Sequence, residues 1–454
     1  MSRGRISTLM RGDGLSARAA RSSTWTILGF GGSQVLRLAS NLILTRMLFP
    51  EAFGVMALVS IFMMGLAMFS DLGVGPAIMQ SKRGDDPEFL NTAWTIQVIR
   101  GFTLWLVATG LSFPMAAFYG EPQLVLLIPV AGAALAISGF NPTRLESAGR
   151  HLLLGRVTAI DMATQVVGIL SAVILAWIFQ SVWALVISGI ISISTQVLLN
   201  WRLLPGITNR FRWESPAAHE LIHFGKWIFL STVAGFFYSQ GDRVVLGKYL
   251  SLEMLGVYNI GFFMASFPLL LGSALVWKIL IPIYRERPPL KSVENFRKLQ
   301  KMRFLLSAGL MAVLILVACS GVILIELLYD PRYASAGAVV VLISCIQVLP
   351  VIGLTYDQAA LASGDSKRFF VLTAYKAVAM IAGLVIGVEV AGLFGALAGQ
   401  GIATLLIYPA TVWLARRQGA WDPLHDSLFA LVGVGGAALA IWLNFPAVSA
   451  LILG

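Results

Sequence analysis

Charged residues are scarce in this sequence. Asp, Glu, Lys and Arg make up 12% of its 454 residues, whereas a soluble domain usually carries about 25%. Only two cysteines occur, Cys319 and Cys345, and each lies inside an apolar run. This excludes a disulfide framework, and free thiols are expected. A water-soluble protein and a disulfide-stabilised secreted domain are therefore both implausible.

Long hydrophobic runs take the place of the missing charges. Hydrophobic residues make up 57% of the chain, and its mean hydropathy is +0.81. Because an apolar stretch of about 20 residues crosses the hydrocarbon core as a helix, we predict an all-α polytopic membrane protein with about 12–14 transmembrane helices. The expected spans are residues 24–46, 53–79, 92–118, 122–141, 157–179, 182–203, 221–247, 253–283, 304–328, 335–361, 368–388, 391–415 and 425–444.

One segment from the first half of the chain recurs in the second half. ILTRMLFPEAFGVMALVSIF at 43–62 aligns without a gap with VLGKYLSLEMLGVYNIGFFM at 245–264. Secondary transporters are commonly built from such repeats, so we predict two pseudo-symmetric six-helix bundles plus a C-terminal helix. The expected divisions are a basic cytoplasmic tail at 1–21, an N-terminal bundle at 22–203, a cytoplasmic connector at 204–220, a C-terminal bundle at 221–416 and an additional transmembrane segment at 417–454.

Basic residues predict the orientation of the chain. With the N-terminus inside, 24 of the 33 Lys and Arg residues fall in inside segments, and only Arg46, Lys248 and Arg332 fall in outside loops. The positive-inside rule then predicts a cytoplasmic N-terminus for a multi-pass membrane protein. The first apolar run, from Thr24, is too long and too polar for a cleavable signal peptide. The net charge of +11 therefore indicates topology, and no nucleic-acid partner is expected.

The first predicted span carries a polar stripe. Gln34, Arg37, Asn41 and Thr45 fall within an arc of about 80° on a helix. An arginine at this depth costs at least ~2.5–3.5 kcal/mol unless it faces protein or water. Arg37 is either the structural partner of a buried carboxylate or carbonyl, or part of a cavity that attracts an anionic substrate. We favour substrate binding by Arg37, with Gln34 and Asn41 beside it.

Other charged residues lie in or near the predicted spans. Arg100 and Lys376 are further candidates for substrate binding, because a guanidinium binds phosphate oxygens bidentately and an ammonium supplies a point charge. Asp71 and Asp357 are candidates for binding a coupling proton or sodium ion. For both carboxylates, a purely structural role is the interpretation that we favour.

One short motif suggests an enzyme. The stretch HELIH at 219–223 matches the zinc-binding pattern H-E-x-x-H. Zinc also needs a third ligand, and only His151 and His425 remain as histidines. We interpret the motif as a chance match, and we expect no metal site, no catalytic residue and no enzymatic activity. No Walker motif is present, so no cofactor is expected beyond a coupling proton or sodium ion.

Several short motifs carry a family resemblance. They are the Pro50-Glu51-x-Phe53-Gly54 turn, the Ser70-Asp71-Leu72-Gly73 run with Gln80, and, in the second half, Phe224-Gly225, Asp242-Arg243 and Leu255-Gly256-x-Tyr258. Over about 20–415 the chain resembles the polysaccharide transporter family of the multidrug/oligosaccharidyl-lipid/polysaccharide flippase superfamily, and most of all colanic-acid exporters and O-antigen flippases. The resemblance implies alternating-access transport of undecaprenyl-pyrophosphate-linked oligosaccharide across the bacterial inner membrane. Its implied partners are this substrate, membrane lipids and a polymerase of the same pathway.

Two alternatives remain open. A multidrug or cation antiporter of the same superfamily would favour an acidic, aromatic pocket, whereas the deep charges here are mainly basic. A membrane-embedded polysaccharide polymerase or ligase would need a substantial outside loop with reactive residues, and every expected outside loop is short. The sequence leaves the sugar, the coupling ion and the oligomeric state open.

Overall fold

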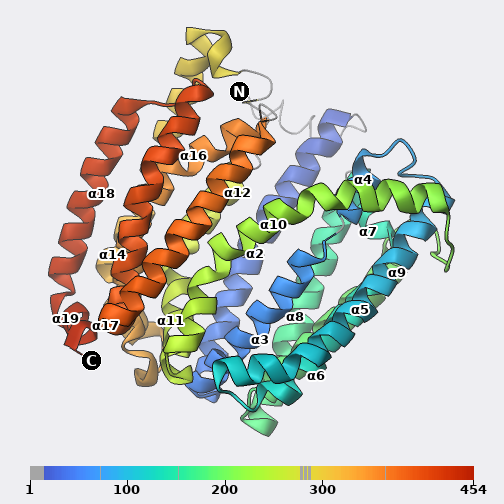
Figure 1. Ribbon diagram of the computed structural model, residues 1–454, viewed down its shortest axis with the longest axis horizontal. Coiled ribbons are helices and arrows are strands. Elements are labelled where there is room, and N and C mark those ends of the chain that lie inside the picture. The colour runs from blue at the N-terminus through green and yellow to red at the C-terminus, as the bar shows by residue number, and fades with distance from the viewer. Residues whose placement is uncertain are drawn as a thin grey trace. The chain divides into compact units, whose positions relative to one another are not determined.

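The computed structural model describes residues 15–71, 73–151, 153–276, 280, 284, 288–362 and 365–453, with side chains except at 15–28, 80, 223–231, 357–362, 366 and 453. Within this part of the chain every regular element is a helix (Figure 1), which confirms the predicted all-α fold. Contacts divide the chain into two compact units. The first unit comprises Met1–Leu48 and Val59–Thr232, and the second unit comprises Phe49–Leu58 and Val233–Gly454.

In the first unit, long helices pack side by side. α5 lies against α6, α8 against α9, and α2 against α8. Two helices, α3 (Pro50–Phe69) and α10 (Ser215–Tyr249), begin in one unit and end in the other. The remaining elements are α2 (Leu15–Met47), α4 (Val74–Gln80), α5 (Pro87–Tyr119), α6 (Leu124–Gly139), α7 (Arg144–Arg150), α8 (Leu154–Phe179) and α9 (Trp183–Leu203).

In the second unit, α14 is the central helix and packs against both α15 and α18. α16 packs against α17, and α11 against α15. The elements are α11 (Leu252–Ala265), α12 (Phe267–Leu275), η2 (Pro289–Lys291), α14 (Val293–Leu328), η3 (Pro331–Tyr333), α15 (Ala336–Ile346), α16 (Val348–Ala362), α17 (Ser366–Arg417), α18 (Pro423–Leu443) and α19 (Phe445–Leu453).

Three predicted spans are broken in the structure. The span at 53–79 divides into α3 and α4, because the Asp71 carboxylate accepts a hydrogen bond from the Gly73 N–H at 2.9 Å and Gly73 has a φ of 60°. The span at 253–283 bends by 45° between α11 and α12, and the span at 335–361 bends by 42° between α15 and α16. A proline near the start of each second helix, Pro268 or Pro350, removes one backbone donor at the bend.

The predicted spans at 368–388 and 391–415 meet in the single element α17. Its backbone leaves the helical conformation at Ala391 and Gly392, and Gly392 has a φ of 55°. Glycine adopts this left-handed conformation without strain, which allows a sharp change of direction. α17 therefore consists of two helical arms, which we call α17a (before Ala391) and α17b (after Gly392).

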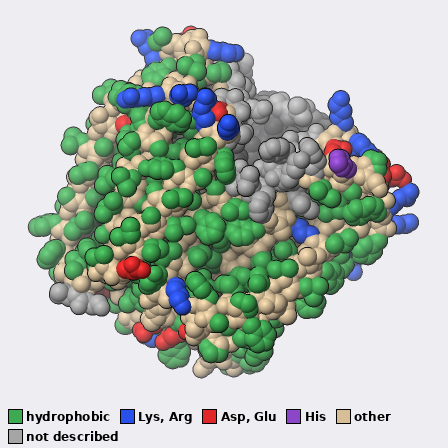
Figure 2. Space-filling model, in the orientation of Figure 1, with side chains coloured by type: hydrophobic (Ala, Val, Ile, Leu, Met, Phe, Trp, Pro, Cys, Tyr) green, Lys and Arg blue, Asp and Glu red, His purple; other side chains and the backbone are tan. Residues whose placement is uncertain are grey.

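The described helices suit a membrane. Seven of them are long and apolar enough to span one, and up to ten spans result if three bent pairs each count as one. Large side chains such as Trp177 and Trp442 are 75% and 72% exposed, as lipid-facing residues would be. Figure 2 shows hydrophobic side chains over most of the visible face, with most Lys and Arg near its margins. The molecule is thus a polytopic membrane protein, as predicted.

Candidate functional site

Two adjoining cavities with polar linings lie within the second unit. They have volumes of about 160 Å³ and 310 Å³ and share several lining residues, so we treat them as one site, the Lys376 cavity. The shared residues are Tyr238, Leu269, Ser273, Pro350 and Thr404. They come from α10, α12, α16 and α17, so the site depends on the packing of four elements.

Lys376 supplies the positive charge of this cavity. Its side chain is 6% exposed, and its Nζ lies 5.6 Å from the ring centre of Tyr238, where a cation–π contact is favourable. A buried ammonium is costly unless a partner compensates it. Lys376 has a further interaction within the protein besides this contact, and its ammonium places a positive charge in the lining of the cavity.

The position of Lys376 depends on glycines in α17. A Cβ added to Gly387 would lie 2.1 Å from the Gly395 carbonyl oxygen, and one added to Gly399 would lie 1.9 Å from the Gly383 carbonyl oxygen. The arms α17a and α17b therefore touch backbone to backbone through two glycine pairs spaced four residues apart, as in small-residue contacts of membrane helices. This contact brings Lys376 on α17a and Thr404 on α17b to the same cavity.

Three polar atoms of the cavity lining have no hydrogen-bond partner among the described residues. They are Asp242 Oδ1, Ser266 Oγ and Gln347 Oε1, and all three are buried. Buried polar groups are nearly always hydrogen-bonded, so atoms of this kind commonly face water or a ligand. The other oxygen of Asp242, Oδ2, accepts a hydrogen bond from Tyr258 at 2.6 Å. The described lining thus holds the ammonium of Lys376, the carboxylate of Asp242 and three polar atoms without a hydrogen-bond partner.

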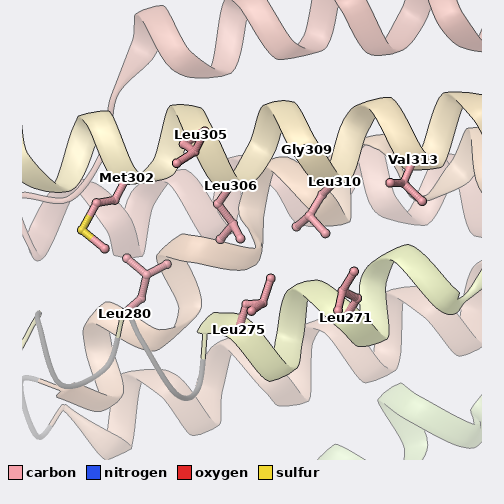
Figure 3. Close-up of a pocket in the computed structure, with 9 residues that line it drawn as sticks. All are labelled: Leu271, Leu275, Leu280, Met302, Leu305, Leu306, Gly309, Leu310 and Val313. Atoms are coloured by element: carbon pink, nitrogen blue, oxygen red, sulfur yellow. The ribbon is translucent and has the colours of Figure 1, made fainter. Parts of the chain in front are cut away.

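A further cavity, of about 440 Å³, has a different chemistry. Figure 3 shows that α12 and α14 line it, with Leu271 and Leu275 on one side and Leu306, Leu310 and Val313 on the other. Its remaining lining residues are Leu280, Met302, Leu305 and Gly309, so every lining residue in the described part of the chain is apolar. This lining suits an apolar group.

The predicted polar stripe lies on α2 in the first unit. Gln34 and Asn41 are half-buried, whereas Arg37 is exposed and Thr45 is fully buried. The Thr45 hydroxyl donates to the Asn41 carbonyl oxygen at 2.8 Å, so this hydrogen bond stays within α2. The exposure of the stripe therefore falls along α2, from the exposed Arg37 to the buried Thr45. Lys376, another predicted substrate-binding residue, lies in the second unit.

Arg100 has a structural role in the part of the chain that is described. Its Nε donates to Ser70 Oγ at 3.0 Å and its Nη2 donates to the Ala67 carbonyl oxygen at 2.7 Å. Both acceptors lie at the C-terminal end of α3, where backbone carbonyls lack intrahelical partners. The guanidinium also interacts electrostatically with Asp71. These contacts make Arg100 a cap for α3, and substrate binding by Arg100 stays a prediction.

The remaining predicted features are the carboxylates Asp71 and Asp357 and the HELIH stretch. Asp71 is exposed and stabilises the turn before α4, while the side chain of Asp357 lies outside the described residues. Within HELIH, Glu220 Oε1 accepts a hydrogen bond from Ser81 at 2.7 Å, and the side chain of His223 lies outside the described residues. Among the described residues no group of three potential metal ligands occurs.

Sequence reasoning missed most of the cavity lining. Tyr238 and Asp242 lie on α10, Gln347 lies at the bend between α15 and α16, and Gln400 lies on α17, far apart in the sequence. The spacing of Gly383 and Gly387 from Gly395 and Gly399 was an available signal, because it predicts two helices in close contact. It could have located Lys376 next to Thr404, but not the side chains from α10 and α15/α16.

A family model described as polysaccharide biosynthesis protein matches residues 43–337. The teichuronic acid biosynthesis protein TuaB of Bacillus subtilis (strain 168) is 21% identical over 308 residues, which cover 66% of this chain and 62% of that protein. The lipopolysaccharide biosynthesis protein WzxC of Escherichia coli (strain K12) is 22% identical, covering 92% of this chain and 85% of that protein. The match to TuaB thus spans about six tenths of that relative's length.

Solved structures share the fold. The lipid II flippase MurJ in an inward closed conformation superposes with a TM-score of 0.64 at 12% identity, covering 95% of this chain and 98% of that one. An inward-facing multidrug resistance transporter of the MATE family and the MOP superfamily gives a TM-score of 0.61 at 17% identity, covering 86% of this chain and 95% of that one. At these identities the likeness establishes the polytopic helical fold.

Proposed function

Because the chain belongs to the polysaccharide biosynthesis protein family, we propose that it is a flippase for lipid-linked oligosaccharide. The substrate is an undecaprenyl-pyrophosphate-linked unit of an exopolysaccharide, capsule or O-antigen, moved across the bacterial inner membrane by alternating access. The lipopolysaccharide biosynthesis protein WzxC among its relatives and the lipid II flippase MurJ among its fold neighbours support this proposal. The chain acts without a catalytic step of its own.

The residues that line the Lys376 cavity support this proposal. A pyrophosphate needs a cation, which Lys376 supplies, and sugar hydroxyls need hydrogen-bond partners, which Asp242, Ser266 and Gln347 have unused. The ring of Tyr238 offers an apolar face in the same cavity. We assign the headgroup to this cavity. The polyprenyl tail stays in the lipid.

One observation favours the alternative, a multidrug or cation antiporter. Asp242 is a buried carboxylate with an unused oxygen, and the rings of Tyr238 and Phe262 line the same cavity. A cationic drug could bind there. The buried ammonium of Lys376 repels such a ligand, which is why the anionic substrate is our main proposal.

A substitution at Lys376 tests the proposal. Lys376→Gln removes the charge and should abolish polysaccharide export while the protein still accumulates, whereas Lys376→Arg should keep part of the export. Lys367→Gln is the matched control, because Lys367 is an exposed lysine on the same helix. Normal export by Lys376→Gln would exclude the substrate role. Drug resistance that rises in this variant would favour the antiporter.

The orientation and surroundings form part of the proposal. The N-terminus lies in the cytoplasm, as the basic residues predict. Membrane lipids surround the helices, and a polymerase of the same pathway receives the product. The polysaccharide biosynthesis relatives support a place in such a pathway.

A further inference from the structure

The segment that joins α9 to α10 is attached to the first unit along its length. Residues 204–214 form no helix, and we call this segment the strap. Near its start, Arg144 Nε donates to the Ile207 carbonyl oxygen at 2.9 Å. Asn209 is buried, and its Nδ2 donates to Thr143 Oγ1 at 2.8 Å. The strap is therefore a built part of the first unit and not a free linker.

The second half of the strap runs along the first turns of α5. Three alternate backbone amides of the strap donate to side-chain oxygens of this helix. These hydrogen bonds join Arg210 N to Asn91 Oδ1 at 2.9 Å, Arg212 N to Thr95 Oγ1 at 3.0 Å and Glu214 N to Thr92 Oγ1 at 3.0 Å. Hydrogen bonding through every second amide is typical of an extended chain, in which successive side chains point to opposite faces. The strap therefore has two faces.

One face of the strap is basic and the other is aromatic. Arg212 Nη2 forms an ion pair with Glu88 Oε1 at 2.7 Å. The ring of Phe211 lies in the other direction, with its centre 4.8 Å from the ring centre of the buried Trp94. Glu88 precedes Trp94 by six residues on α5, which is about 9 Å along the helix axis. The two faces thus lie at different depths along α5.

The basic face lies nearer the membrane surface. α5 is a candidate membrane span of 33 residues, so it is about 50 Å long and exceeds the hydrocarbon core of about 30 Å. Its first turn therefore reaches the headgroup layer, and α5 begins at Pro87, directly before Glu88. Trp94 is deeper. The strap thus presents arginine toward the headgroups and aromatic rings toward the acyl chains.

Both faces of the strap are open. Phe211 and Trp213 are 66% and 55% exposed, and aromatic rings of this kind are enriched where a membrane meets water. Arg210 and Arg212 are exposed as well. Arg212 has Glu88 as its partner, whereas Arg210 forms no ion pair with a described carboxylate. The basic face therefore complements an anion at the membrane surface.

We propose that the strap is a binding site for an anionic phospholipid. Its phosphate binds Arg210, with Arg212 beside it, because a guanidinium suits phosphate oxygens. Its glycerol and upper acyl chains lie against Phe211 and Trp213. Anionic lipids attract basic residues at the membrane surface, so phosphatidylglycerol is preferred over the zwitterionic phosphatidylcholine. This inference goes beyond the flippase function, because the ligand is a lipid of the surrounding membrane and not the transported one.

Spin labels test the placement of the two faces. The full-length protein, with Cys319 and Cys345 replaced by serine, is reconstituted in vesicles of phosphatidylglycerol and phosphatidylcholine. A nitroxide is attached in turn to the variants Arg210→Cys, Phe211→Cys, Arg212→Cys and Trp213→Cys. Oxygen, which concentrates in the membrane, should reach the second and fourth labels best, and a water-soluble nickel complex should reach the first and third. Equal access of the nickel complex to all four labels would overturn the proposal.

A crosslinking lipid tests the charge. Phosphatidylglycerol with a photoactivatable group near its headgroup is added to the purified protein without substrate, and crosslinked peptides are identified by mass spectrometry. Crosslinks should occur in the strap, and Arg210→Gln should raise the half-saturating lipid concentration about fivefold. This variant keeps the backbone amide that bonds Asn91, and its melting temperature should match the wild type. Arg297→Gln, at an exposed arginine of α14, is the matched control and should change neither value.

Competition identifies the source of the phosphate. Unlabelled phosphatidylglycerol should suppress crosslinking of the strap, whereas phosphatidylcholine should suppress it far less. Equal suppression by the two lipids, or an unchanged half-saturating concentration for Arg210→Gln, would overturn the proposal. Suppression by inorganic pyrophosphate at the same concentration would also overturn it, because the site would then bind the headgroup of the proposed substrate.

Discussion

Gly54 and Gly256 pack backbone against backbone in the second unit. A Cβ on Gly54 would lie 2.0 Å from the carbonyl oxygen of Leu252, and a Cβ on Gly256 would lie 2.1 Å from the carbonyl oxygen of Pro50. The two glycines are 202 positions apart, as are Pro50 and Leu252. The contact is therefore reciprocal, as a two-fold relationship between the repeated segments requires. It also explains why glycine follows Phe53 in the first repeat and Leu255 in the second.

Gly54→Ala should destabilise the protein. The added methyl group would meet a backbone oxygen that cannot rotate away, and overpacking of this kind costs about 1–3 kcal/mol. A lower melting temperature and lower abundance in the membrane are the expected results. Gly110→Ala is the matched control, because a Cβ at this helical glycine meets nothing within 4 Å. Equal melting temperatures for the two variants would contradict the close contact.

Gly387→Val should separate the arms α17a and α17b. The added side chain would clash with the Gly395 carbonyl oxygen, 2.1 Å from the new Cβ, and would move Lys376 away from Thr404. We expect loss of polysaccharide export together with a moderate loss of thermal stability. Gly435→Val, at a glycine with nothing within 4 Å, should have neither effect. Full export by Gly387→Val would show that the cavity tolerates separation of the arms.

Arg37 and Arg100 should respond differently to alanine. Arg100→Ala removes the cap from the carbonyl oxygen of Ala67 and from Ser70 at the end of α3, so protein abundance should fall. Arg37→Ala should leave abundance near normal and abolish export, if the exposed guanidinium contacts substrate as we predict. Export assays and membrane immunoblots on the same cells distinguish the two effects. Loss of export by Arg37→Ala only in proportion to lost protein would assign it a structural role.

The stability of the protein should depend on pH through the carboxylate of Asp86. Hydrogen bonds from Arg83 and from the backbone of Glu88 hold the pKa of Asp86 below its usual value. A lowered folded-state pKa stabilises the protein above the unfolded value of about 4 and is lost as pH falls through the folded value. The melting temperatures of the wild type and Asp86→Asn should therefore differ at pH 7 and converge below about pH 4. A constant difference over this range would contradict the ionic contribution.

The predicted orientation can be tested by labelling. With Cys319 and Cys345 replaced by serine, single cysteines at Arg212 and Lys291 should resist membrane-impermeant thiol reagents in intact cells. Both positions are exposed in the structure, so burial would not protect them. A cysteine at the exposed Lys248, which we expect outside, should react and serves as the positive control. Rapid labelling of Arg212→Cys and Lys291→Cys would reverse the topology.

The sequence by itself determined the helical membrane fold and its family. Scarce charge and long apolar runs leave a chain no stable option in lipid except helices, because every backbone polar group must be paired within its own segment. The repeat was likewise visible, since Gly54 and Gly256 keep their register. The short motifs between Pro50 and Tyr258, taken as a set, carried the family resemblance, which the match to residues 43–337 confirms.

Only the tertiary structure decided which polar residues meet. Arg37 and Arg100 looked alike in the sequence, yet Arg100 caps α3 while Arg37 is exposed. His425 looked like a spare histidine until the fold placed it against Ser307, which is 118 residues away in the sequence. Hydropathy reports how deep a residue lies in the membrane, but the partner of a side chain depends on the rotation and crossing of helices. Packing between segments far apart in the sequence sets these angles.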